Sequence, residues 1–179
     1  TSATGDYYVF ARVVHNTPST LEDTVTANNY VVRAGTIKVN NTRSDLTPSN
    51  FVFFPATINA GSNPDSVAFR LTNNGPVDLA SPNTRVDGMY YLSTNTTFGD
   101  ADDLLMGTNN FNVSLASGLS TDVVSSISGR ADITVPATAL GTYYVFVKVL
   151  HKSPSLLTDP VTGNDYAMRV GTIQVTPPC

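Results

Sequence analysis

The sequence contains one cysteine, no tryptophan, one glutamate and three lysines among its 179 residues. Because Cys179 is the only cysteine, no internal disulfide can form, and the chain fits either a reducing compartment or a surface protein without disulfides. Glu and Lys are good helix formers, so their shortage makes a long surface helix unexpected. The absence of Trp disfavours an aromatic platform that stacks against sugars.

Clustered basic residues and long apolar runs are also missing. The formal net charge is -4 and the pI is about 4.8, so the chain lacks the positively charged face that a nucleic acid or an anionic membrane would require. No apolar run approaches the roughly 18 residues that span a bilayer. We therefore expect no nucleic-acid partner and no membrane insertion.

Motifs of nucleophilic and nucleotide-dependent catalysis are absent from the sequence. It has no Gly-x-Ser-x-Gly elbow, phosphate-binding loop or dinucleotide fingerprint, and Cys179 stands at the end of the chain rather than in a preorganised site. His15 and His151 occupy equivalent places in a repeated segment, before the Pro-Ser pairs at 18–19 and 154–155. We predict that each histidine bonds the turn that follows it, and that the protein is not an enzyme.

One segment of the chain occurs twice. Residues 5–39 align without a gap to residues 141–175 at a constant offset of 136, which is 141 minus 5, and 20 of the 35 aligned positions are identical. The first copy contains YYVFARVVH at 7–15, and the second contains YYVFVKVLH at 143–151. A repeat of this length indicates that one supersecondary unit is used twice, which constrains the architecture more than any single motif does.

The remaining pattern is that of short strands bounded by turns. Apolar and β-branched runs alternate with turns that contain Asn, Gly and Pro, and no helical period links them. The expected strands are 50–58, 66–73, 84–94, 102–107, 110–116, 121–136, 142–151 and 165–175, where 121–136 is either two strands or one long bulged strand around Gly129. This spacing predicts an all-β protein: an immunoglobulin-like antiparallel β-sandwich of about seven strands, with an N-terminal β-hairpin that repeats the last two strands.

The first strand of the repeat has two apolar faces, because alternate residues of a strand point to opposite sides. In the second copy the expected core face carries Tyr143, Val145, Val147 and Val149. The opposite face is too apolar for ordinary exposure, so it is either covered by loops or neighbouring strands, or it is a contact surface. The first copy keeps this division. We therefore predict four interface residues, two in each copy: Tyr8, Phe10, Tyr144 and Phe146.

Several stretches carry a resemblance to a known family. They are DLTPSNFVFFPATINAGS at 45–62, FRLTNNGP at 69–76, YYLSTNTTFGDADDLLMG at 90–107, ITVPATALGTYYVFVKV at 133–149 and GNDYAMRVGTIQV at 163–175. On these stretches, residues 45–175 resemble the CARDB domain, a cell-adhesion-related, immunoglobulin-like sandwich of bacteria and archaea. Near the last turn the family usually has an acidic residue followed by two Asn. This chain reads VTANNY and VTGNDY there, so the expected Glu is missing. The resemblance implies an adhesive role at a bacterial or archaeal cell surface, or outside the cell.

The repeat also predicts how the chain is divided. Residues 1–39 are interpreted as the C-terminal hairpin of a preceding repeat, 40–44 as a linker, 45–176 as a complete CARDB-like sandwich and 177–179 as a tail. A two-stranded hairpin is marginally stable alone, so the first copy needs a partner sheet. Three partners stay open: upstream strands of a long array, a neighbouring subunit joined by strand addition, or the chain's own sandwich, onto which the hairpin folds back.

One loop offers candidate metal ligands. Asp100, Asp102 and Asp103 lie within four positions of the sequence, and carboxylates on a loop suit Ca²⁺. The spacing differs from that of an EF-hand, because no Glu closes the loop. A solvated acidic turn and a Ca²⁺ site both stay open as interpretations. Asp23 and Asp159, equivalent positions of the repeat, are a second candidate, and no other cofactor is expected.

Covalent modification and cross-linking have candidate sites as well. Asn-x-Ser/Thr triplets begin at Asn40, Asn95 and Asn112, which permits N-glycosylation in a secretory context. Cys179 follows Thr-Pro-Pro and, at a true C-terminus, would be an exposed thiol able to cross-link chains.

The sequence as a whole favours a non-enzymatic, extracellular structural or adhesive repeat module. We expect it to assemble in tandem or end to end, with strand complementation into a filament as one mode. Its expected partners are other copies of itself or neighbouring repeats, with surface proteins or glycans as further candidates. The alternative is a carbohydrate- or protein-binding accessory module of a secreted enzyme.

Overall fold

The computed structural model describes residues 5–13, 29–39, 43–79, 84–126, 132–153, 159 and 161–178. Every regular element in these ranges is a β-strand, and no helix there is long and apolar enough to cross a membrane. The chain divides into two compact units, unit 1 at Thr1–Asn41 and unit 2 at Thr42–Cys179.

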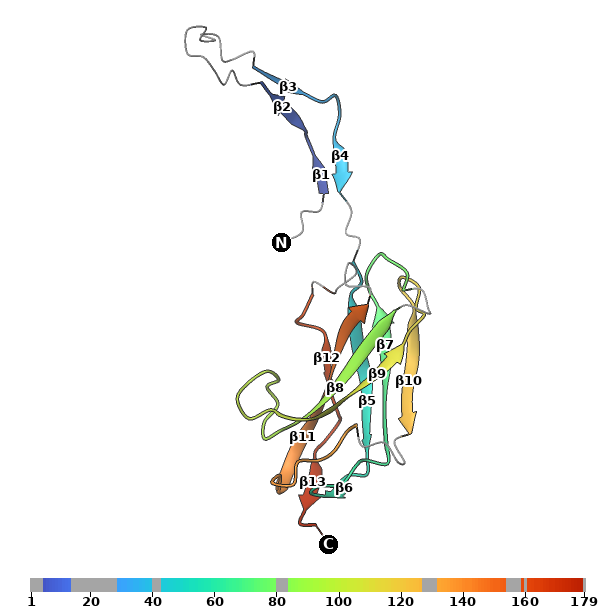
Figure 1. Ribbon diagram of the computed structural model, residues 1–179, viewed down its shortest axis with the longest axis vertical. Helices are drawn as coiled ribbons and strands as arrows, with labels where there is room; N and C mark the ends of the chain where they lie inside the picture. Colours follow the sequence, from blue (N-terminus) through green and yellow to red (C-terminus); the bar gives the residue numbers. More distant parts are fainter. Residues whose placement is uncertain are drawn as a thin grey trace. The chain divides into compact units, whose positions relative to one another are not determined.

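Unit 2 contains two sheets that enclose one core (Figure 1). In the smaller sheet, β7 (Ser66–Asn73) lies between β10 (Ser120–Ser126) and β5 (Leu46–Phe54). The larger sheet follows the order β6 (Thr57–Asn59), β13 (Ile173–Thr176), β11 (Gly141–Ser153), β8 (Arg85–Ser93) and β9 (Leu104–Asn112). A further strand, β12 (Tyr166–Met168), also pairs with β11. The predicted all-β, immunoglobulin-like sandwich is confirmed.

Two prolines bear on β5: Pro48 lies inside the strand and Pro55 directly follows it. The strand starts at Leu46, just after the segment 40–44 that was predicted to be a linker and four residues before the predicted start at 50. Pro48 is tolerated there because β5 lies at the edge of its sheet, where a missing N–H breaks no ladder. Pro55 ends the strand, and the chain then enters the other sheet as β6, which runs parallel to β13. The single strand predicted at 50–58 is therefore two strands in different sheets.

Other strand boundaries also differ from the prediction. The runs 102–107 and 110–116 contribute to one strand, β9, which continues past a register shift opposite Tyr90 and Tyr91. The expected strand 165–175 is interrupted, because the backbone turns at Gly171 with a φ of 72° before β13 begins. Of the expected segment 121–136, the described part gives β10 and a bridge between Ile133 and Gly107.

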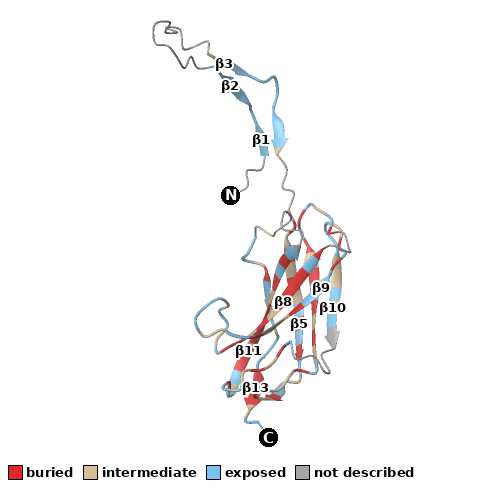
Figure 2. Cartoon of the chain, viewed as in Figure 1, coloured by how far each residue is buried: buried red, intermediate tan, exposed pale blue. Residues whose placement is uncertain are grey.

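The core of unit 2 is apolar and draws on both sheets. Its residues include Phe53 from β5, Val67 and Leu71 from β7, Leu92 from β8 and Val145 from β11. Figure 2 shows these buried positions as red bands that run along the strands of both sheets. The predicted core face of β11 is confirmed, since Tyr143, Val145, Val147 and Val149 are all buried. Removal of this apolar surface from water is the main stabilising contribution to the sandwich.

Unit 1 reproduces the hairpin of unit 2 in backbone register. Its strands are β1 (Gly5–Tyr7), β2 (Phe10–Arg12), β3 (Tyr30–Val32) and β4 (Ile37–Val39), with β1 paired to β4 and β2 to β3. Gly5 lies opposite Val39 as Gly141 lies opposite Val175, and Phe10 opposite Val32 as Phe146 opposite Met168. Each pair of equivalent residues differs by the sequence offset of 136, so the repeat is a structural repeat.

Hydrogen bonds outside the ladders agree with this equivalence. The amide of Val13 donates to the carbonyl of Asn29 at 2.8 Å, and the amide of Val149 donates to that of Asp165 at 2.7 Å. Gly35 and Gly171, at the same place in the turn, have φ values of 75° and 72°. Glycine suits both turns, because residues that carry a side chain rarely adopt such a positive φ.

Candidate functional site

The loop between β8 and β9, residues 94–103, is held by Asp102. Its Oδ2 atom accepts hydrogen bonds from the backbone N–H of Thr94 at 2.8 Å, from the Thr94 hydroxyl and from the Ser93 hydroxyl at 3.2 Å. Its Oδ1 atom accepts one from Asn95 Nδ2 at 2.9 Å. The interaction with the Asp100 carboxyl and the hydrogen bonds from Thr94 hold the pKa of Asp102 well below its ordinary value.

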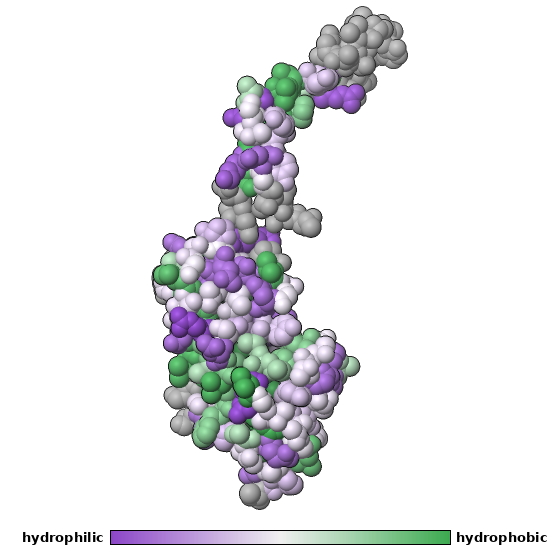
Figure 3. All heavy atoms as spheres, turned by 180° about the vertical axis from the view of Figure 1, so that it is seen from behind, coloured by the Kyte–Doolittle hydropathy of each residue, from purple (hydrophilic) through white to green (hydrophobic). Residues whose placement is uncertain are grey.

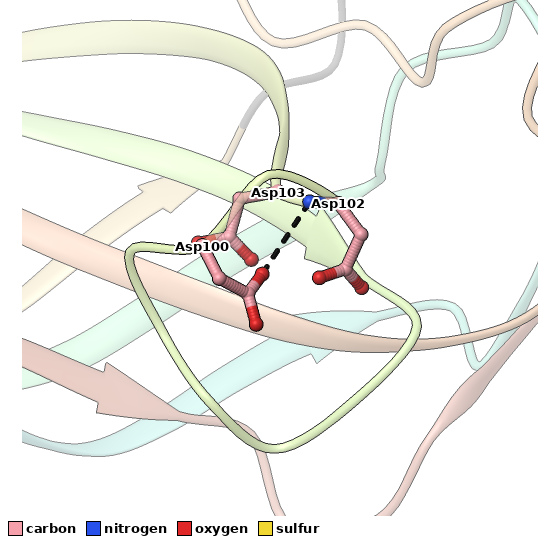
Figure 4. Close-up of side chains that lie close together, drawn as sticks. All are labelled: Asp100, Asp102 and Asp103. Carbon is pink, nitrogen blue, oxygen red and sulfur yellow. Dashed lines mark hydrogen bonds between the residues drawn. The ribbon is translucent and has the colours of Figure 1, made fainter.

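The other two carboxylates of the loop lie beside Asp102. One ligand atom from each of Asp100, Asp102 and Asp103 lies within 4.8 Å of the others (Figure 4). Asp100 accepts hydrogen bonds from Asn95 Nδ2 at 3.0 Å and from the backbone N–H of Asp102 at 3.4 Å, and Asp103 accepts one from the N–H of Gly99 at 2.5 Å. The three predicted residues are therefore brought together. They are the described residues that could hold a hard divalent cation, and their oxygens also accept donors of their own loop.

The same loop places an aromatic ring on the outer face of the larger sheet. Phe98 lies 4.8 Å from Tyr166 of β12, 5.4 Å from Phe146 of β11 and 5.2 Å from Tyr91 of β8, measured between ring centroids. The ammonium of Lys148 lies 6.0 Å from the centre of the Phe98 ring, a distance at which a cation attracts the ring face. Phe98 thus packs over three strands of the sheet.

The predicted interface residues differ in exposure between the two units. Phe146 is 1% exposed, because Phe98 and Tyr166 pack against it, whereas Phe10, its equivalent in unit 1, is 63% exposed. Tyr144 is half-buried, whereas Tyr8 is 65% exposed. Of the two interpretations of this face, cover by a loop or strand and use as a contact surface, the structure shows the first for Phe146. Sequence reasoning missed Phe98, whose signal is an aromatic residue in an otherwise polar turn, TNTTFGDADD.

A second group of carboxylates lies where the β11–β12 connection meets the start of β5. Asp159 Oδ2 accepts the backbone N–H of Leu46 at 2.5 Å, and Asn164 Nδ2 donates to Asp45 Oδ1 at 2.8 Å. Asp165 is 3% exposed, and its Oδ1 atom has no hydrogen-bond partner among the described residues. Asp159, the second candidate of the sequence analysis, therefore belongs to a group that ties the end of the repeat to the first strand of the sandwich.

Burial and like charge raise the pKa values of this group. The pKa of Asp165 is raised to about 7, first by burial and then by the neighbouring Asp159 carboxylate, while Lys148 opposes the shift. Burial also raises the pKa of Asp159, against the N–H donors of Leu46 and Val161. In the first copy the position equivalent to Asp165 is Asn29, an amide that carries no charge at any pH. A protonated carboxyl at 165 would have nearly the same shape and one donor.

The remaining candidates of the sequence analysis fall into two groups. His151 is buried on β11, and its Nδ1 atom lies 2.8 Å from the Ser44 hydroxyl. Asn112 is exposed at the end of β9, whereas the Asn95 amide is engaged by two carboxylates. His15, Asp23, Asn40, Cys179 and the Pro-Ser pairs at 18–19 and 154–155 lie outside the described residues.

Solved structures similar to this chain include two of one archaeal domain. The crystal structure of a CARDB domain from Pyrococcus furiosus, in complex with di-metal ions, is 14% identical and has a TM-score of 0.42. The match covers 78% of this chain and 100% of that one. The solution structure of the same domain is 16% identical, with a TM-score of 0.43, and the match covers 76% of this chain and 98% of that one. The fold resembles that of the CARDB domain.

Part of a larger enzyme is also similar in structure. A β-glucosidase from Listeria innocua, in complex with glucose, is 14% identical with a TM-score of 0.37; the match covers 78% of this chain but 17% of the enzyme. No family model matches the chain, and no curated protein matches it.

Removal of the Phe98 ring should destabilise unit 2. We expect Phe98→Ala to lower its free energy of unfolding by roughly 2–4 kcal/mol, because the substitution uncovers Phe146 and removes the ring nearest to Tyr166. Urea unfolding followed by circular dichroism measures the change. Phe54→Ala is the matched control, since Phe54 is 55% exposed, and should change stability by less than about 1 kcal/mol. Equal effects of the two substitutions would contradict the covering role of Phe98.

The pKa of Asp165 predicts a pH dependence of stability. Between its unfolded value, about 4, and its folded value, the folded chain binds more protons than the unfolded chain, so stability falls as pH rises. Each pKa unit corresponds to about 1.4 kcal/mol. We expect Asp165→Asn to remove this decline and to be the more stable protein at pH 8, as measured by urea unfolding at several pH values. A variant that is less stable than the parent at pH 8 would refute the assignment.

Calcium should have little effect on the acidic loop. Because N–H, amide and hydroxyl donors of the loop already engage Asp102, we expect the same melting temperature in CaCl₂ and in EDTA. A rise in calcium that EDTA reverses, and that Asp102→Asn abolishes, would instead establish a Ca²⁺ site at Asp100, Asp102 and Asp103.

Proposed function

We propose that this protein is a non-enzymatic, extracellular structural module that works in series with modules of the same kind. The observation that carries the proposal is the repeated hairpin. A second copy of the last strands of unit 2 occurs in unit 1 with the same register, the same turn glycine and the same bonds outside the ladder. A unit used twice in one chain is typical of proteins built as arrays.

The surface chemistry of the described residues supports a module that binds other proteins rather than one that transforms a substrate. Asp102 accepts hydrogen bonds from its own loop, Asp159 accepts one from the first strand of the sandwich, and Phe98 covers the outer face of the larger sheet. The sequence resemblance to CARDB implies adhesion at a cell surface, and the chain's abundance of Asn and Thr with few Lys is consistent with such a location.

The location is tested by labelling intact source cells with an antibody raised against residues 42–179. We expect labelling without permeabilisation, and loss of the signal after brief treatment of the cells with a protease. An antibody against a cytoplasmic protein is the control, since it should label permeabilised cells alone. Labelling that requires permeabilisation would sink the proposed function.

A further inference from the structure

The two hairpins differ in what covers them. The residues of the second copy that face the core are 9% exposed at Tyr143, 0% at Val145, 2% at Val149 and 1% at Ile173. The equivalent residues of the first copy are 39% exposed at Tyr7, 41% at Val9, 76% at Val13 and 39% at Ile37. Figure 2 shows the strands of unit 1 in pale blue, and in Figure 3 green hydrophobic spheres lie on its surface. The same apolar face is therefore buried in one copy and partly exposed in the other.

The buried copy shows which elements cover this hairpin. The edge of β11 that faces away from β12 pairs with β8, from Tyr144 opposite Ser93 to His151 opposite Val86. The edge of β13 that faces away from β11 pairs with β6, with Val175 opposite Ile58. The core face packs against the smaller sheet, and the outer face is covered by Phe98. Each of these elements lies between residue 42 and residue 140 of the chain.

The first copy keeps the features that meet this cover. Phe10 and Tyr30 have ring centroids 6.5 Å apart, and their equivalents, Phe146 and Tyr166, have centroids 6.2 Å apart beneath Phe98. Gly5 and Gly141, which begin the two hairpins, have φ values of 127° and 115°. Both hairpins therefore begin at a glycine in a similar, positive-φ conformation, and the second follows directly on residues 42–140, which contain its cover.

We infer that the first hairpin completes a second sandwich whose other strands have the character of residues 42–140 and belong to a repeat joined to Gly5. This inference rests on the proposed function, because it names the partner through which modules in series connect. The joined repeat supplies a β8-like strand for the free edge of β2, a β6-like strand for the free edge of β4, and a Phe98-like ring over Phe10 and Tyr30.

Another intact molecule is a poorer partner for the hairpin. In such a molecule β8 is already paired on both edges, with β9 and β11, and β6 is already paired with β13. The first hairpin would have to displace its own second copy to reach these edges. Strands that carry no hairpin of their own, as in a repeat joined directly to Gly5, need no displacement.

The test is a chimera in which residues 42–140 are placed directly before Gly5 of the otherwise intact chain. Unit 2 stays in the same molecule and serves as the internal standard for folding. We expect a second cooperative unfolding transition, and amide exchange in Phe10–Arg12 slowed at least about a hundredfold relative to the parent chain. Exchange in these residues that equals the parent's would overturn the inference.

A matched pair of substitutions identifies the site of the new packing. In the chimera, Ile37→Ala should lower the melting temperature of the first sandwich by as much as Ile173→Ala lowers that of the second. In the parent chain Ile37→Ala should leave the melting temperature unchanged, because the Ile37 side chain is exposed there. If Ile37→Ala is silent in the chimera, the hairpin has not joined the added strands and the inference fails.

The parent chain alone separates the other two partners. If the amides of Phe10–Arg12 exchange slowly and their exchange rate falls further as protein concentration rises, the cover comes from another molecule. If they exchange slowly at a rate independent of concentration, the cover comes from the chain's own sandwich. Either result overturns the joined-repeat inference. Neither bears on surface labelling, so failure here is distinguishable from failure of the proposed function.

Discussion

The structure depends on one constraint: the strand pair at 141–175 has apolar residues on both faces, and both must be kept from water. Val145 and Val147 face the core, while Phe146 points to the other side. A sandwich ordinarily covers one face of each sheet and leaves the other to the solvent. Here the second face needs its own cover. Unit 2 supplies it with the loop 94–103, which also carries the acidic cluster.

The acidic loop is best understood through this cover. Phe98 has to be held against Phe146, and a loop of polar residues has little tendency to take one conformation alone. Asp102 gathers a hydroxyl of Ser93, a backbone N–H of Thr94 and the amide of Asn95, which ties the loop to the end of β8. A carboxylate that accepts several hydrogen bonds stays ionised, in agreement with its lowered pKa. The cluster that reads as a metal site is therefore also the anchor of an aromatic cover.

Several features were within reach of sequence reasoning and others were not. The period-2 pattern of 143–149 identified its core face, because alternation depends on local backbone geometry alone. The split of 50–58 was missed, since the pattern does not tell that the chain changes sheets at Pro55. Phe98 was missed because the ring it covers lies far away in sequence. The raised pKa of Asp165 could not be predicted from the sequence, because its first cause is burial and the residues around it in the sequence do not specify burial.

By itself the sequence determined that the chain is built of strands, that one hairpin occurs twice and that its two copies share a core-facing pattern. These properties follow from composition, alternation and identity between residues at a constant offset. Only the tertiary structure decided which apolar residues are buried. Val9 and Val145 are both valines at equivalent positions of the repeat, and they differ in the segments that surround them. Burial depends on what other segments pack against a strand, and a strand's own residues do not specify that.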